Sequence, residues 1–152
     1  FAGIFMIAVQ AGLIRWAIPR LGAFRAGVLG MVAMTAAFCG YALSIHDWQL
    51  YPWLALASLS GFVTPAFQAI MTGQIPANAQ GELQGAMSCL NSIASIIGPV
   101  MLTQLFSRFT SAEAPVYFPG IPFLAAALLT LICLAVFSFV VVRHGISGQL
   151  RN

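Results

Sequence analysis

The chain of 152 residues is strongly apolar, because 61% of its residues are hydrophobic and only 6% are charged. An ordinary soluble domain carries about 25% charged residues, so water is not the expected solvent for most of this surface. The formal charge of +3 comes from six arginines and three acidic residues, with no lysine. These arginines stand between long apolar runs, whereas a nucleic-acid site needs cations clustered on a polar face. The composition therefore favours a membrane protein and argues against a nucleic-acid partner.

Apolar runs, taken in chain order, predict membrane spans. A bilayer core about 30 Å thick needs about 20 apolar residues in a helix. The first run, at about 1–18, meets Arg15 too early to cross unaided, and we expect it to be the remainder of a longer helix whose upstream sequence is missing. The next four runs are long enough to cross. They lie at about 26–45, 50–72, 83–107 and 120–142. The expected fold is all-α, a polytopic membrane helical bundle of about five spans.

The connectors between these runs are short, so neighbouring spans should be antiparallel. If the first connector faces the cytoplasm, that side receives every arginine except Arg108. Such an excess of cations is typical of the cytoplasmic side, and it predicts a cytoplasmic C-terminus. Aromatic residues, which favour the membrane interface, gather on the outer side. They are Trp48, Tyr51, Trp53, Tyr117 and Phe118.

Two predicted spans carry small and polar residues at helical spacing. In the span at 50–72 these residues lie three or four positions apart, which places them on one face of an α-helix. They are Ser58, Gly61, Pro65, Gln68 and Thr72. The span at 83–107 has a similar face between Gly81 and Pro99, with Asn91 beside it. The spans at 26–45 and 120–142 lack such a face and can tolerate lipid around much of their circumference.

Three large amides, Gln10, Gln68 and Asn91, lie at membrane depth in otherwise apolar spans. Burying an unpaired amide costs roughly several kcal/mol, so each needs another polar group, water or a substrate. We therefore expect a substrate cavity lined by these amides, with Phe67 and Met71 as its apolar wall. The alternative for the small residues of the two faces is tight helix packing without any ligand.

Pro65 and Pro99 stand in the interior of predicted spans, and a glycine lies close to each of them. Proline removes a backbone hydrogen bond and kinks a helix, which suits a gating role for Gly61, Pro65, Gly98 and Pro99. Proline is also simply common in membrane helices. Both interpretations stay open.

Two strings, GFVTPAFQ at 61–68 and GELQG at 81–85 followed by Gly98-Pro99, resemble the last helices of major facilitator drug:proton antiporters, particularly the tetracycline-efflux branch. The resemblance implies that the five spans are helices eight to twelve of a twelve-helix carrier. It places helices eight, ten and eleven around a central cavity, and nine and twelve outside. The first connector resembles the second copy of the family's cytoplasmic loop motif. The residues that carry this likeness are Arg15, Arg20, Gly22 and Arg25.

The resemblance implies a secondary active transporter fragment that exports a drug or small amphipathic metabolite in exchange for protons. Met34 stands where tetracycline exporters of this branch usually carry an aspartate, which favours a generic amphipathic substrate. The spans have no acidic residue or histidine in their central sections, so the coupling site is expected upstream. The alternatives are a non-transporting membrane scaffold and an uptake carrier for another small solute. An enzyme is not expected, because the serines in the spans lack a histidine or acid partner.

The expected partners are the lipid bilayer, a small-molecule substrate, protons and the missing N-terminal half of the same carrier, which would be a monomer when complete. The expected location is the bacterial inner membrane. No cofactor or metal is expected, because Cys39, Cys89 and Cys133 match no metal motif.

Overall fold

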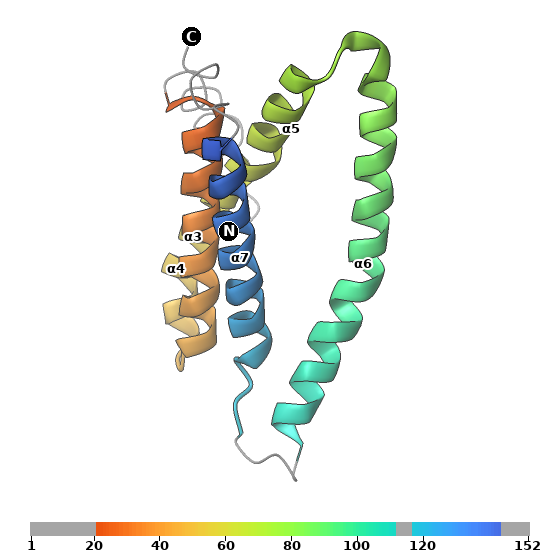
Figure 1. The fold of residues 1–152 in the computed structure, drawn as a ribbon. Helices are drawn as coiled ribbons and strands as arrows, with labels where there is room; N and C mark the ends of the chain where they lie inside the picture. Colours follow the sequence, from red (N-terminus) through yellow and green to blue (C-terminus); the bar gives the residue numbers. More distant parts are fainter. Residues whose placement is uncertain (1–20, 112–116, 144–152) are drawn as a thin grey trace.

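The computed structural model describes residues 21–111 and 117–143. Gln10, Arg15, Arg20 and the predicted span at 1–18 lie outside the described residues. The described chain contains helices and no strand, which confirms the predicted all-α class. In chain order its helices are α3 (Ala23–Leu43), the 3₁₀ helix η2 (Asp47–Gln49), α4 (Leu50–Ser58), the 3₁₀ helix η3 (Leu59–Phe62), α5 (Val63–Gln74), the 3₁₀ helix η4 (Ala77–Ala79), α6 (Gln80–Thr110) and α7 (Ile121–Arg143) (Figure 1).

Four helical segments are long and apolar enough to cross a membrane. They are Ala23–Leu43, Asp47–Gln74, Ala77–Thr110 and Ile121–Arg143. These segments overlap the second to fifth predicted spans and extend beyond the apolar runs, because polar connectors also form helical turns. In η2, for example, the Gln49 side-chain oxygen accepts hydrogen bonds from the backbone N–H groups of Ile45 and His46, at 3.0 and 3.3 Å. The described residues thus form a polytopic membrane helical bundle.

Helix α3 occupies the centre of the packed part of the bundle, between α7 on one side and α4, η3 and α5 on the other. Small residues allow this close approach. A β-carbon on Gly30 would lie 3.2 Å from the Leu59 carbonyl oxygen, and one on Gly27 would lie 3.4 Å from the Ala66 β-carbon. The burial of many α3 residues differs from the expectation that this span tolerates lipid around much of its circumference. Gly27 and Gly30, two small residues of this helix, face its neighbours.

Helices α3 and α7 run antiparallel along their whole length. Near one end the Phe24 and Phe137 rings are 5.5 Å apart, and near the other the Tyr41 and Phe123 rings are 5.6 Å apart. This pairing brings Arg25 and Arg143 to the same end of the bundle. Their shared position is what the positive-inside prediction requires, and the orientation in the membrane stays a prediction.

The segment Asp47–Gln74 is not one continuous α-helix. Pro65 has no N–H group to donate to the carbonyl one turn earlier, and the chain tightens into η3 just before it, where Val63 N–H bonds to Ser60 O. Beyond η3, α5 leans away from the α3 and α7 pair and toward α6 (Figure 1). The prediction that five residues share one α-helical face over this span is therefore wrong, because η3 interrupts the helical period between Ser58 and Gln68.

Helix α6 stands apart from the packed helices for most of its length and curves in its second half (Figure 1). None of its residues is buried against the described chain. Pro99 lies inside it without ending it. Past its end the Phe118 N–H donates to the Phe109 carbonyl at 3.1 Å, which ties the end of α6 to the approach of α7. Arg108 therefore lies at the end of the bundle opposite Arg25 and Arg143.

Candidate functional site

A groove of about 430 Å³ lies between α5 and α6, the two helices whose sequences carry the polar faces. Helix α5 contributes one described side chain, Gln68, which is exposed. Helix α6 contributes the rest of the lining. These residues are Gln84, Met87, Ser88, Asn91, Ser92 and Ser95.

The α6 side of this groove follows from helical periodicity. Gln84, Ser88, Asn91 and Ser95 are spaced four, three and four residues apart, so an uninterrupted α-helix presents them on one face. α6 is continuous over this stretch. Of the polar face predicted for this span, Ser88, Ser92 and Ser95 line the groove opposite Gln68, together with the neighbouring Asn91.

Some polar side chains of the groove already form hydrogen bonds to backbone carbonyls of α6, and others do not. Ser92 Oγ donates to the Ser88 carbonyl at 3.0 Å, and Ser95 Oγ donates to the Ser92 carbonyl at 2.8 Å. These hydroxyls keep only their acceptor capacity. Within the described chain, the carboxamides of Gln68, Gln84 and Asn91 have no side-chain hydrogen bond and are exposed.

Among the residues that the structure describes, no charged side chain lines the groove. Each carboxamide offers an oxygen acceptor and two N–H donors, so the surface can pair with a ligand that alternates donors and acceptors. Met87 adds an adaptable apolar contact. Chemically the groove suits the polar, uncharged face of an amphipathic molecule.

The structure brings together two of the three amides predicted to bind substrate, Gln68 and Asn91. It places the predicted apolar wall elsewhere. The Phe67 ring packs 4.6 Å from the Phe137 ring in the hydrophobic core, and Met71 is half-buried and does not line the groove. The third amide, Gln10, lies outside the described residues.

Sequence reasoning missed Gln84 and Met87 as groove residues. Gln84 was part of the motif at 81–85, and it stands four residues before Ser88 on the same face. That spacing was sufficient to include it. Met87 had no distinguishing signal, because a methionine in an apolar helix is ordinary.

The predicted gating residues lie on both helices of the groove. Gly61 belongs to η3 and Pro65 to the first turn of α5. Gly98 and Pro99 lie in α6 beyond the groove, and a β-carbon on Gly98 would meet nothing within 4 Å. Their gating role stays a prediction.

Of the predicted loop residues, Gly22 and Arg25 are described. Gly22 has φ 78° directly before α3, a conformation that favours glycine. Arg25 is exposed in the first turn of that helix.

Comparison with known proteins finds several tetracycline resistance proteins. The class G protein of Vibrio anguillarum is 34% identical over 117 residues, which cover 77% of this chain and 28% of that protein. The class C protein of Escherichia coli is 30% identical over 132 residues, which cover 87% of this chain and 32% of that protein. These matches confirm the predicted resemblance to a tetracycline-efflux-like region.

A more distant similarity extends over almost the whole chain. The human hippocampus abundant transcript-like protein 1 is 23% identical over an alignment of 164 positions, which covers 99% of this chain and 32% of that protein. The chain spans less than a third of the length of these curated relatives. No family model and no solved structure matches it.

Proposed function

We propose that the chain is the cavity-forming end of a secondary carrier that exports a drug or small amphipathic metabolite by alternating access. The observation that supports this best is the groove in which Gln68 of α5 faces Gln84 and Asn91 of α6, with no charged side chain among the described lining residues. In this proposal the chain contributes helices eight to twelve of a major facilitator protein in a bacterial inner membrane, with its C-terminus in the cytoplasm. The rest of the carrier closes the cavity.

The amides act by pairing with polar groups of the substrate in place of water. The free-energy cost of replacing the water at an exposed carboxamide by a ligand is small. Each neutral hydrogen bond to the ligand then adds about 1 kcal/mol to the binding free energy. Proline at the junction of η3 and α5 allows α5 to change its lean. That change would widen or narrow the groove, because Gln68 moves with α5 while the other lining residues stay on α6.

Proton coupling is assigned to the part of the carrier outside this chain. The described acidic side chains, Asp47 and Glu82, stand at helix ends and not at the centre of a span. A coupling group needs a pKa that depends on which side is open, and a residue in continuous contact with water on one side does not provide this.

The test uses the protein expressed from its complete coding sequence in bacteria that lack their own efflux pumps. A panel of amphipathic drugs that includes tetracycline is first screened for energy-dependent uptake into everted membrane vesicles. The double variant Gln68→Ala and Asn91→Ala should then raise the half-saturating concentration of the best substrate about tenfold or more, since two hydrogen bonds are lost. Unchanged transport by the double variant would refute the assignment.

The matched control is Gln104→Ala. It removes an exposed amide from the same helix, outside the groove. Its transport should equal that of the parent protein.

The scaffold alternative predicts no drug transport by the complete protein. The uptake alternative predicts accumulation in right-side-out vesicles and none in everted ones. The vesicle experiment therefore separates all three functions.

A further inference from the structure

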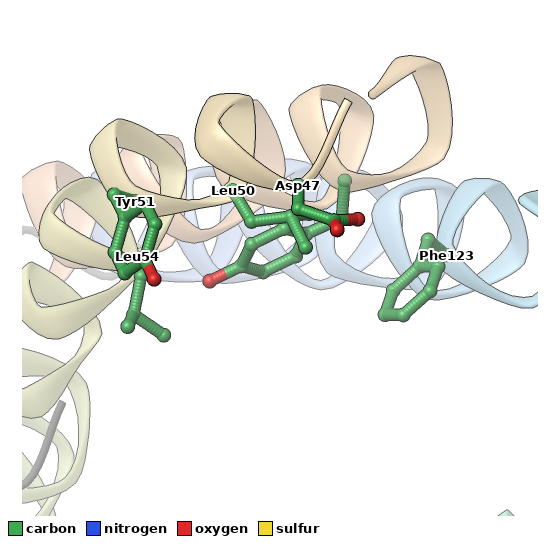
Figure 2. A pocket seen from close by; sticks show the side chains of 6 residues that line it. Asp47, Leu50, Tyr51, Leu54 and Phe123 are labelled. Carbon is green, nitrogen blue, oxygen red and sulfur yellow. The ribbon is translucent and has the colours of Figure 1, made fainter. Parts of the chain in front are cut away.

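A second groove, of about 440 Å³, lies at the end of the bundle where α3 ends and α7 begins. It shares no residue with the groove between α5 and α6. Figure 2 shows Tyr51 and Leu54 toward one end, Leu50 and Asp47 in the middle and Phe123 toward the other end. Tyr41, whose ring is 5.6 Å from that of Phe123, completes the lining.

The groove runs along one face of the chain from η2 into α4. Asp47, Leu50 and Leu54 are spaced three and four residues apart, so they follow one helical stripe. Seven residues of helix correspond to about 10 Å. The Asp47 carboxylate thus lies at the start of the span. Leu50 and Leu54 follow it toward the hydrocarbon core of the membrane.

Among the described residues, Asp47 is the only charged one that lines the groove. It is exposed, and it has no ion pair within the described residues. Of the described arginines, Arg25 and Arg143 lie at the opposite end of the bundle, and Arg108 lies at the same end as Asp47 without forming an ion pair with it. The remaining lining is apolar apart from the tyrosine hydroxyls. The groove therefore combines one free negative charge at the membrane edge with an apolar channel beneath it.

We propose that this groove binds a phospholipid with a primary ammonium headgroup, phosphatidylethanolamine. Its ammonium group pairs with the Asp47 carboxylate, and one acyl chain lies along Leu50 and Leu54. The carboxylate selects among lipids, because an anionic phosphatidylglycerol brings only negative charge to this position. The exposed Trp48, next to Asp47 in sequence, and the exposed Tyr51 of the lining belong at the headgroup level, where such a lipid would sit.

The experiment measures lipid binding to the protein from its complete coding sequence, delipidated in detergent. Native mass spectrometry counts bound lipid during titration with phosphatidylethanolamine or phosphatidylglycerol. The parent protein should bind phosphatidylethanolamine about fivefold more tightly, since an exposed ion pair contributes up to about 1 kcal/mol. Asp47→Asn should lose this preference, and Asp47→Glu should keep most of it.

The matched control is Glu82→Gln, which removes a carboxylate far along the chain from the groove. It should bind both lipids as the parent does. Leu50→Trp fills the channel and should weaken both lipids, with unfolding followed by circular dichroism to confirm that the variant is folded. Equal binding of the two lipids by the parent protein would overturn the proposal, whatever the variants do. Retention of the preference by Asp47→Asn would overturn it as well.

Discussion

The indole ring of Trp53 packs directly onto Gly40, so closely that a β-carbon at position 40 would overlap the ring. This contact joins the end of α3 to the beginning of α4 across the connector that contains η2. Gly40→Ala should therefore destabilise the bundle by about 1–3 kcal/mol, the usual cost of overpacking. The measurement is the thermal unfolding of the protein in detergent.

Gly73→Ala is the control for this prediction. Gly73 also lies in a helix, but its β-carbon would meet nothing within 4 Å. It should leave the unfolding temperature unchanged or raise it slightly, because alanine favours a helix by about 1 kcal/mol. Equal effects of the two substitutions would contradict the packing described here.

Phe137 anchors the core formed by α3, α5 and α7, since its ring contacts both Phe24 and Phe67. Phe137→Ala should cost about 2 kcal/mol. The cavity left by the lost ring costs free energy. The cost of exposing the ring on unfolding is small, because lipid tails are also apolar. Phe139→Ala, which removes a ring that is 62% exposed, should cost much less. The difference between the two unfolding temperatures in detergent measures the effect.

The interruption at η3 has a consequence for water access along the predicted polar stripe. After removal of the native cysteines, Gln68→Cys should react readily with a membrane-impermeant maleimide, because this position is exposed in the groove. Ser58→Cys should react slowly, because Ser58 is only 5% exposed and bonds to the Ala55 carbonyl at 2.6 Å. Similar labelling rates at the two positions would indicate a continuous water-lined face and contradict the interruption.

Pro65→Ala should allow the α-helix to continue through η3 and reduce the lean of α5. We expect slower transport at saturating substrate and equal or greater stability, because alanine restores the N–H group that can bond to the carbonyl one turn earlier, in η3. Pro122→Ala is the control, since Pro122 lies in the first turn of α7, where its missing N–H is not needed. If transport by Pro65→Ala equals that of the control, Pro65 has no gating role.

The sequence was sufficient to predict the helical class and the positions of the four spans that the structure describes, because long apolar runs with few charges have few other interpretations. The placement of Gln68 and Asn91 in one groove also followed from the sequence, because large amides in apolar spans need polar surroundings. The placement of Phe67 did not. It is adjacent to Gln68 in sequence, but successive helical residues point in directions about 100° apart, and only the packing of α7 shows that Phe67 belongs to the core.

The break at η3 was likewise only half visible in the sequence. Pro65 predicted a kink, but a proline inside a span does not say where the helix tightens. Small residues such as Gly30 and Gly40 fit either lipid contact or close packing, and their role depends on which helix is opposite. In the structure Leu59 lies opposite Gly30 and Trp53 lies opposite Gly40, and both partners belong to the next span of the chain.

The central claim is that the groove between α5 and α6 receives the substrate, and substrate protection tests it most directly. In the complete protein without native cysteines, Gln84→Cys and Gln104→Cys are labelled with a maleimide in the presence and absence of the best-transported drug. We predict that the drug slows labelling at position 84 and leaves position 104 unchanged. No protection at position 84, or equal protection at both positions, would contradict the account.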